Sequence, residues 1–219
     1  MFERLLSLVI GYFCGSFLTA DVVCMHAIGK TAHEVGSGNP GMTNVWRNVG
    51  KKEGGIVLVG DIAKAAIAMG LSYFLFRQRI GKIAMQYAGL GSVLGHDFSF
   101  MAHGHGGNGV AVTGTWLVLG LGWWGLLAGM VAGSFVFTTG LMPLTAVMLG
   151  IISTITAFLV ADVETGVLFA ISCIIIIWRH REGMGRVFRG EQEHVLKLTE
   201  VYAKYKAKKT AEEGARQDE

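Results

Sequence analysis

The sequence predicts an all-α, polytopic transmembrane bundle of seven helical spans, with its N-terminus outside and its C-terminus in the cytoplasm. Of its 219 residues, 52% are hydrophobic and only 16% are charged, whereas soluble domains carry about 25% charged residues. The apolar residues form long uninterrupted blocks, which are typical of transmembrane helices. The length suits one compact bundle, so an ordinary soluble enzyme is excluded.

The apolar blocks predict the spans in order. The first three cover residues 5–28, 55–76 and 83–102. The block over 110–178 breaks near Gly122, near 140–143 and near 162–164, which adds four spans, the first of them short. If two short spans form a re-entrant or surface segment, the total falls to five. The first span lacks a clear small-residue cleavage site, so we predict that it is retained and is not a signal peptide.

Small residues recur inside these blocks at the spacing of helix contacts. They are Gly11 and Gly15, Gly91 and Gly95, and then Gly125, Gly129 and Gly133. Small residues four apart let membrane helices approach closely, so we interpret these glycines as packing positions. The three cysteines, Cys14, Cys24 and Cys173, lie in apolar segments without disulfide or metal spacing and are also interpreted as packing residues.

Lysine and arginine placement predicts the orientation. With the N-terminus outside, the loop over 29–53 and the tail from Arg179 are cytoplasmic and carry 14 of the 19 basic residues, against four outside and Lys64 within a span. An odd number of spans places the loops after spans one and three on the same face as the tail. Three polar segments can therefore converge on one site.

The first polar segment covers residues 36–47, and its side chains suit an anion. It carries Ser37, Asn39, Thr43, Asn44 and Arg47 among several glycines. Arginine offers a planar fork of donors that matches phosphate, and glycines let backbone N–H groups point at an anion. An ordinary polar turn that caps a helix near Asn44 is the alternative, and the residues alone leave both open.

Asp61 and Lys64 lie within the second span at a spacing of three residues, so they share one helix face. Ionisable residues at membrane depth are costly and are usually functional or paired with each other. A structural ion pair is one interpretation. We favour a lysine that reaches towards a phosphate site, because this span follows the first polar segment directly.

The second polar segment combines histidines with a glycine-rich loop. His96, His103 and His105 surround it, and its loop reads Gly106, Gly107, Asn108 and Gly109. The histidine spacing matches no standard metal template, so we predict no metal. The loop better fits an anion-binding turn that enters a short helix.

The third segment follows the last span and contains His180, Arg181, Glu182, Arg186 and Glu191. A basic cluster at this position often reflects only membrane topology and contact with lipid. The more specific interpretation is a second phosphate-binding group beside Arg47. The chain has no G-x-S-x-G elbow and no histidine followed five residues later by aspartate. The sequence therefore offers no obvious covalent nucleophile.

Together, the three segments resemble the bacterial integral-membrane glycerol-3-phosphate acyltransferases that use acyl phosphate as donor. Residues 36–47 match that family's first motif, S-G-N-x-G-x-T-N-x-x-R, at every fixed position. The second motif is matched mostly, at Gly95, His96, Phe98, Gly106, Gly107, Gly109 and Val110. The third is matched mostly, at His180, Arg186, Gly190 and Glu191, and Asp61 and Lys64 also lie where the family carries such a pair.

The resemblance implies a multi-pass protein of the bacterial inner (plasma) membrane, with an active site that faces the cytoplasm. It implies acyl transfer from acyl phosphate to the sn-1 hydroxyl of glycerol 3-phosphate, giving lysophosphatidic acid and phosphate for phospholipid biosynthesis. The implied partners are these two small-molecule substrates and membrane lipid, with no nucleic acid. No cofactor, coenzyme A or metal is implied, and the oligomeric state stays open.

The resemblance also implies roles for individual residues. The predicted catalytic residues are His180, Arg47, Asn44 and Ser37. The predicted phosphate-binding residues are Asn39, Thr43, Lys64, Gly106, Gly107, Asn108, Gly109 and Arg186. The predicted supporting residues are Asp61, His96 and Glu191.

The chain departs from the family pattern at four positions. Asn108 replaces the lysine of G-G-K-G, His105 stands where a basic residue commonly precedes the glycine pair, Ser99 replaces a proline, and Gly183 replaces an asparagine. A diverged paralogue that binds a phosphorylated lipid or metabolite without turnover is therefore a second hypothesis. A small transporter is a third, although the polar residues crowd one face and do not line a path through the midplane.

We divide the chain into a transmembrane acyltransferase-like domain over 1–190 and a cytoplasmic tail over 191–219. In the tail, Val195, Leu198, Tyr202 and Tyr205 recur at helical spacing among lysines. This pattern predicts an amphipathic helix on anionic lipid. The last ten residues are predicted to be disordered.

Overall fold

The computed structural model describes residues 1–192, and these contain α-helices, two short 3-10 turns and no strand. The helices are α1 (Phe2–Gly15), α2 (Thr19–Ile28), α3 (Met42–Asn48), α4 (Lys51–Ile80), α5 (Ile83–Asp97), α6 (Val110–Leu121), α7 (Trp123–Thr139), α8 (Met142–Val160), α9 (Val163–Arg179) and α10 (Arg181–Phe188). The 3-10 turns are η1 (Ala32–Glu34) and η2 (Phe100–Ala102). The predicted tail helix and disordered end fall on 193–219, outside the described residues.

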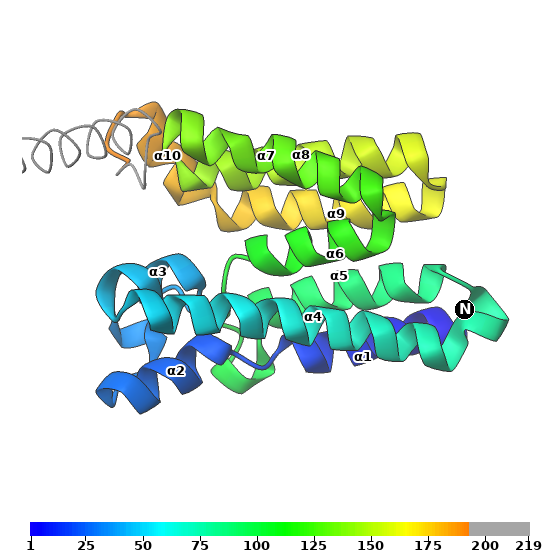
Figure 1. Ribbon diagram of the computed structural model, residues 1–219, viewed down its shortest axis with the longest axis horizontal. Helices are drawn as coiled ribbons and strands as arrows, with labels where there is room; N and C mark the ends of the chain where they lie inside the picture. The colour runs from blue at the N-terminus through cyan, green and yellow to red at the C-terminus, as the bar shows by residue number, and fades with distance from the viewer. Residues whose placement is uncertain (193–219) are drawn as a thin grey trace, which may run out of the picture.

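The helices form two layers with α6 between them (Figure 1). One layer contains α1, α2, α4 and α5, and the other contains α7, α8 and α9. The indole of Trp116 on α6 stacks on the ring of Phe169 on α9, with ring centroids 3.8 Å apart. Both side chains are fully buried, so this stack joins α6 to the second layer.

Successive long helices alternate in direction, which brings all three polar segments to one end of the molecule (Figure 1). We call this the site end; it holds α3, the loop between α5 and α6, and α10. The N-terminus lies at the opposite end. The convergence predicted from an odd number of spans is therefore present in the fold.

The first predicted span is interrupted, which the sequence analysis missed. Residues 16–18 separate α1 from α2, although the stretch Phe2–Ile28 as a whole is long and apolar enough to cross a membrane. The break frees backbone carbonyls that need partners in an apolar surrounding. Lys64 Nζ donates to the carbonyl of Phe17 at 2.8 Å, and Ser99 Oγ donates to the carbonyl of Ser16 at 2.6 Å. Two polar side chains remote in sequence thus stabilise the interruption.

The other predicted spans correspond to α4, α5, α6, α7, α8 and α9, with altered lengths. The second extends over Lys51–Ile80, and the third ends at Asp97 and not at residue 102. Three described stretches are long and apolar enough to span a bilayer, and a fourth joins them if α9 and α10, bent by 59°, count as one. Since α6 has 12 residues and α7 has 17, against the ~20 of a typical spanning helix, a count of seven crossings stays a prediction.

The packing of α1 on α5 depends on glycine. A Cβ added at Gly11 would overlap the carbonyl oxygen of Ala88, and one added at Gly91 would overlap that of Leu8. Gly15 and Gly95 are equally close to backbone atoms of the opposing helix. The two backbones are therefore in direct contact, which confirms the interpretation of these four glycines as packing positions.

Candidate functional site

Asn44 organises the first polar segment. Its Nδ2 donates to the carbonyls of Ala32 and Val35 at 3.2 and 2.9 Å, and its Oδ1 accepts from the backbone N–H of Ser37 at 3.0 Å. The side chain is buried beneath the loop, and Asn48 Nδ2 donates to the same Oδ1 at 3.0 Å. Both ends of the amide are thus used to shape the loop, which indicates a positioning role for Asn44.

The loop above Asn44 turns at two glycines and presents polar groups at its surface. Gly36 and Gly38 have φ of 54° and 72°, a region in which a side chain is strained. Ser37 and Arg47 are exposed, and Asn39 and Thr43 are half-buried. These four residues therefore have the access to ligand that their predicted roles require.

Glu34 closes this loop at its start. Its Oε2 accepts from both the backbone N–H and the hydroxyl of Thr31, each at 2.8 Å. These hydrogen bonds lower the pKa of Glu34, because they stabilise its charged form. The carboxylate is therefore part of a capping box on η1.

Lys64 lies at the centre of a buried polar network. Its Nζ is 2.8 Å from Asp61 Oδ1, 2.8 Å from the carbonyl of Phe17 and 2.8 Å from His96 Nδ1. An ammonium group has three hydrogens, so these three acceptors use all of them. Lys64 and Asp61 thus form the structural ion pair that the sequence analysis weighed second. The predicted contact of Lys64 with phosphate stays a prediction, and in this arrangement no hydrogen of its ammonium is left for it.

His96 connects this polar network to the glycine loop. The N–H of Gly107 donates to the carbonyl of His96 at 2.9 Å, and that of Gly106 donates to the carbonyl of Asp97 at 3.1 Å. A Cβ at Gly107 would overlap His96 Nε2. The loop can therefore fold back onto the end of α5 only because these positions are glycine. Gly109, with φ of 69°, then turns the chain into α6.

The three histidines of the second segment differ in their burial. His96 is buried, whereas His103 and His105 are exposed. Within residues 1–192, no group of three or more histidine, cysteine, aspartate or glutamate side chains is arranged to hold a metal ion.

Arg179 and Asp97 belong to the site and were missed by the sequence analysis. Arg179 Nη2 donates to the carbonyl of Gly106 at 2.6 Å, and its guanidinium lies 5.8 Å from the ring of Phe98. Asp97 is fully buried against Gly109, and its carboxylate oxygens have no hydrogen-bond partner within the described residues. The sequence does contain a signal for both residues, because each is an ionisable residue at the end of an apolar run.

The third segment begins at a bend between α9 and α10. His180 occupies the bend and is buried, and within residues 1–192 its Nε2 has no hydrogen-bond partner. Arg186 and Glu191 are exposed; Arg186 Nε donates to Gln192 at 3.2 Å and Arg189 Nε donates to Glu191 at 2.7 Å. The predicted residues of this segment thus differ in their access to solvent.

The packing of α10 against α8 explains why residue 183 is glycine. A Cβ added there would lie 2.7 Å from Cγ of Pro143 on α8. The asparagine that the family pattern carries at this position would therefore collide with the proline. Its replacement by glycine allows α10 to pack on α8.

The three segments are linked through specific contacts. Lys64 and His96 connect the helix that follows the first segment to the glycine loop, and Arg179 connects the glycine loop to the third segment. α3 and α10 lie at the same end of the molecule, in different layers (Figure 1).

Comparison with known proteins agrees with this arrangement. Residues 5–190 match the model of the glycerol-3-phosphate acyltransferase family. The chain belongs to this family. It is 35% identical over 205 residues to "Glycerol-3-phosphate acyltransferase 1" of Lactobacillus johnsonii, covering 92% of this chain and 97% of that one. It is 32% identical over 192 residues to the glycerol-3-phosphate acyltransferase of Bacillus subtilis, covering 87% and 96%.

The fold is similar to that of a solved member of the family. Crystal structures of PlsY (YgiH), an integral membrane glycerol 3-phosphate acyltransferase, match with TM-scores of 0.76 for the glycerol 3-phosphate form and 0.73 for the lysophosphatidic acid form. Sequence identity is 27% and 26%, and each covers 87% of this chain and 94% of the other. The family resemblance and the all-α integral membrane class predicted from the sequence are both confirmed.

Proposed function

We propose that this protein transfers an acyl group from acyl phosphate to the sn-1 hydroxyl of glycerol 3-phosphate, giving lysophosphatidic acid and phosphate for phospholipid biosynthesis. The acceptor is supported by the family and by the glycerol 3-phosphate named for a similar solved structure. Acyl phosphate as donor is supported by the match of the three sequence motifs. The acyltransferase-like domain is proposed to cover 1–190, with the tail over 191–219 appended to it.

The observation that carries the proposal is the pair of contacts that links the glycine loop to the helix after the first polar segment and to the start of the third segment. Lys64 joins His96 at 2.8 Å, and Arg179 joins Gly106 at 2.6 Å. An enzyme that condenses two phosphorylated substrates must hold two phosphoryl groups within reach of each other. The contacts attach the glycine loop to α4, which follows the first loop, and to the end of α9, which precedes His180.

In this proposal the two phosphate groups are bound by different segments. Arg47 binds the phosphate of glycerol 3-phosphate, helped by Ser37, Asn39 and Thr43, because its planar fork matches phosphate oxygens. The loop from Gly106 to Gly109 and the N-terminus of α6 bind the acyl phosphate, since a helix N-terminus favours anions. The N–H groups of Gly106 and Gly107 already donate to the carbonyls of Asp97 and His96, so these two residues shape the loop and those of Asn108 and Gly109 are proposed to face the phosphate. Asn108 and Arg186 flank the second phosphate.

The chemical step needs little beyond alignment. The hydroxyl oxygen attacks the carbonyl carbon of the acyl phosphate, the bond from that carbon to the phosphate oxygen breaks, and phosphate leaves with the electron pair. His180 orients the hydroxyl or accepts its proton; the departing phosphate is the alternative acceptor. An acyl phosphate is already an activated anhydride, so positioning and stabilisation of developing charge supply most of the rate.

Residues beneath the loops act by positioning. Asp61, Lys64 and His96 support the glycine loop from below, and Asn44 supports the first loop. Glu191 is proposed to support the third segment, in which it pairs with Arg189. These residues are expected to affect activity through the geometry of the loops.

We also propose seven crossings of the bacterial inner membrane, with the N-terminus outside and the active site facing the cytoplasm. The alternating direction of the helices and the excess of basic residues in the sequence over 29–53 and from Arg179 onward support this orientation. Single cysteines introduced at Ser37 and at Arg181 should both react with an impermeant thiol reagent from the cytoplasmic side. Labelling of the two from opposite sides would exclude a common active site.

The decisive experiment measures phosphate release from purified protein mixed with palmitoyl phosphate and glycerol 3-phosphate. Release that requires both substrates supports acyl transfer, and Arg47→Ala should abolish it in protein that remains folded. Saturable binding without release would support the non-catalytic paralogue. Flux of glycerol 3-phosphate across proteoliposomes would support the transporter.

Asn108→Lys tests whether a missing positive charge limits turnover. A charge-assisted hydrogen bond to phosphate is stronger than a neutral one, so the variant should raise the activity. An unchanged rate would remove that explanation. The matching restoration at Gly183 requires a change of Pro143 as well, because of their close packing.

A further inference from the structure

A buried carboxylate lies behind the N-terminus of α6. Asp97 is the last residue of α5 and is fully buried, and within residues 1–192 neither of its carboxylate oxygens has a hydrogen-bond partner. A Cβ added at Gly109, the N-cap of α6, would lie 2.7 Å from Oδ1 and 3.0 Å from Oδ2. The carboxylate therefore lies against the backbone at which the phosphate of the acyl donor is proposed to bind.

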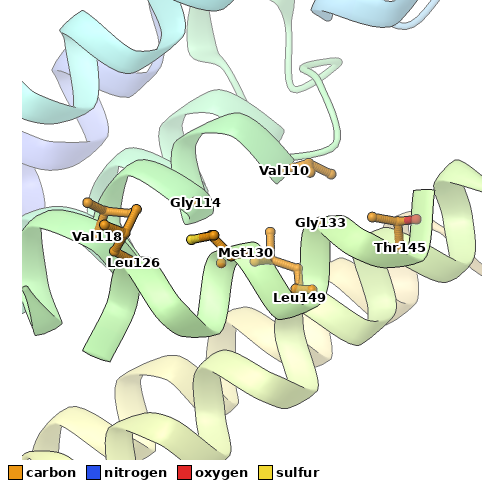
Figure 2. A pocket seen from close by; sticks show the side chains of 10 residues that line it. Val110, Gly114, Val118, Leu126, Met130, Gly133, Thr145 and Leu149 are labelled. Carbon is orange, nitrogen blue, oxygen red and sulfur yellow. The ribbon is translucent and has the colours of Figure 1, made fainter. Parts of the chain in front are cut away.

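The same end of α6 also borders an open apolar groove of about 350 Å³, which lies between α6, α7 and α8 (Figure 2). Val110, the first residue of α6, lines it. Thr145 has the one polar side chain among the described residues that line the groove, and its hydroxyl already donates to the carbonyl of Leu141 at 3.0 Å. Since none of these lining residues is charged, the groove supplies no cation to the end of the helix.

The buried charges around the glycine loop can cancel one another. Lys64 and Asp61 form one ion pair, with 2.8 Å between Nζ and Oδ1, and the three hydrogens of the ammonium are all used. Arg179 acts on Asp97 by its charge, and an ionised Asp97 balances that charge. Asn108 in the loop is neutral. A phosphate with two negative charges would therefore meet no net positive charge from these four ionisable groups.

Two anions at one buried site favour the binding of a proton. The phosphate of the acyl donor and Asp97 would be separated by little more than the backbone at Gly109. Like charges that share a site raise the affinity of that site for a proton, as in pairs of carboxyl groups that hold one proton between them. A phosphate beside a buried carboxylate is the same case.

We propose that acyl phosphate binds together with one proton, which Asp97 and the phosphate hold between them. Asp97 thereby sets the protonation state in which the acyl donor is accepted. The inference rests on the proposed function, because it concerns the phosphate of that reaction's donor, and it gives Asp97 a part in the affinity for this substrate.

Other groups near the glycine loop also titrate, so the test compares ratios of dissociation constants. Lys64 on α4 and Arg179 on α9 act on Asp97 by their charges. The further titratable side chains around Asp97 and the loop are Tyr12 on α1, Asp61 on α4, His96 on α5, His103 and His105 in the loop, and His180 between α9 and α10. A ratio taken at each pH cancels their contributions, because both proteins in the comparison contain them.

The test measures binding of the methylene analogue of palmitoyl phosphate, in which a CH₂ group replaces the bridging oxygen and prevents transfer. Its dissociation constant is determined between pH 6 and 9.5 for the unmodified protein and for Asp97→Asn. As pH rises, the unmodified protein should lose affinity relative to Asp97→Asn by up to about tenfold per pH unit, because one bound proton accompanies the ligand. A ratio that stays constant over this range would overturn the proposal.

Glu182→Gln is the matched control, since it removes a carboxylate that is exposed on α10 at the same end of the molecule. Its affinity ratio to the unmodified protein should not change with pH. An equal change in Glu182→Gln and Asp97→Asn would assign the effect to the general charge of this end and overturn the role of Asp97.

A second measurement needs only the unmodified protein and stays decisive if Asp97→Asn does not fold. The monomethyl ester of the methylene analogue keeps a single negative charge over the whole pH range, so its affinity should stay constant while that of the analogue falls. A parallel pH dependence of the two ligands would contradict a shared proton and leave acyl transfer intact. Absence of binding by both ligands, together with absence of phosphate release from the substrates, would overturn the proposed function and this inference with it.

Discussion

The layer that contains α1, α4 and α5 and the layer that contains α7, α8 and α9 are held together in different ways. In the first, α1 and α5 touch through their backbones at Gly11 and Gly91, and Lys64 ties a broken helix to α5. In the second layer and α6, close backbone contact occurs between Gly125 and Leu117, but large side chains such as Trp116 and Phe169 make other contacts, and a groove remains open.

This difference matches two demands of the reaction proposed above. Groups that align two phosphates need fixed positions, and close backbone contact with satisfied polar groups leaves few alternatives. A hydrocarbon chain needs only apolar space, which the second layer provides beside α6. Rigidity and free volume are thus separated within a chain of 219 residues.

The largest expected effect follows from removing the central cation of the first layer. Lys64→Met leaves the Asp61 carboxylate buried without its partner, and it leaves the carbonyl of Phe17 unpaired. Loss of one member of a buried ion pair costs about 3–5 kcal/mol. Unfolding in detergent, followed by circular dichroism, should show a loss of this size.

The double variant Asp61→Leu with Lys64→Met is the control. Replacing both members of a buried pair by apolar groups is often nearly neutral, so it should recover part of the lost stability. If Lys64→Met alone unfolds like the original protein, the network does not hold the first layer together.

A smaller loss of stability is expected when a glycine that touches a neighbouring backbone is replaced, and almost none when the glycine faces open space. Gly11→Val pushes a side chain into the backbone of α5, and overpacking against atoms that cannot move aside should cost about 3 kcal/mol. Gly133→Val enters open space and should change the free energy of unfolding by less than about 0.5 kcal/mol. Equal losses in the two variants, measured by the same unfolding assay, would contradict the contrast between the layers.

The same glycines show what spacing in a sequence can predict. A separation of four residues correctly indicated contact at Gly11, Gly15, Gly91, Gly95 and also at Gly125, whose added Cβ would overlap the carbonyl of Leu117. It was wrong for Gly133, where an added Cβ would meet no atom within 4 Å. Spacing identifies residues on one face of a helix, but the direction of that face depends on packing between distant segments.

Only part of the site could be predicted, again because local sequence does not show how distant segments pack. The three polar segments and their convergence followed from local composition and from the parity of the spans. The break at residues 16–18 could not be read from its apolar sequence, because it depends on Lys64 and Ser99 from other helices. Asp97 and Arg179 were missed because single charges at the ends of apolar runs resemble ordinary topology signals.

A comparable pair of contacts links the two layers at opposite ends of the molecule. At the site end, Arg179 donates to the carbonyl of Gly106. At the far end, Arg4 on α1 forms a bidentate pair with Glu164 on α9, at 2.6 and 2.9 Å. Substitution of one arginine or the other should therefore weaken the contact between the layers either near the proposed active site or far from it.

Arg179→Met should lower kcat/KM by roughly thirtyfold, because the loss of a charged hydrogen bond costs about 2 kcal/mol and releases the glycine loop. Arg4→Met should lower the unfolding temperature slightly and leave kcat/KM unchanged, because it lies away from the site. A similar fall of kcat/KM in both variants would mean that activity depends on contact between the layers in general, and not on the position of Gly106.

The smallest expected effect concerns the surface of the site end. Because hydrogen bonds from Thr31 lower the pKa of Glu34, they stabilise the first loop above the ordinary carboxyl pKa, and this contribution is lost as pH falls through the lowered value. Thr31→Val removes the hydroxyl and keeps the backbone N–H, so the pKa of Glu34 should rise only part of the way. Hydrogen exchange of residues 29–41, followed by mass spectrometry between pH 3 and 6, should show the loop opening at a slightly higher pH in the variant. Exchange in α7 should not change, since the second layer contains no part of this loop; a shift there as well would mean that the two layers respond to acid as one unit.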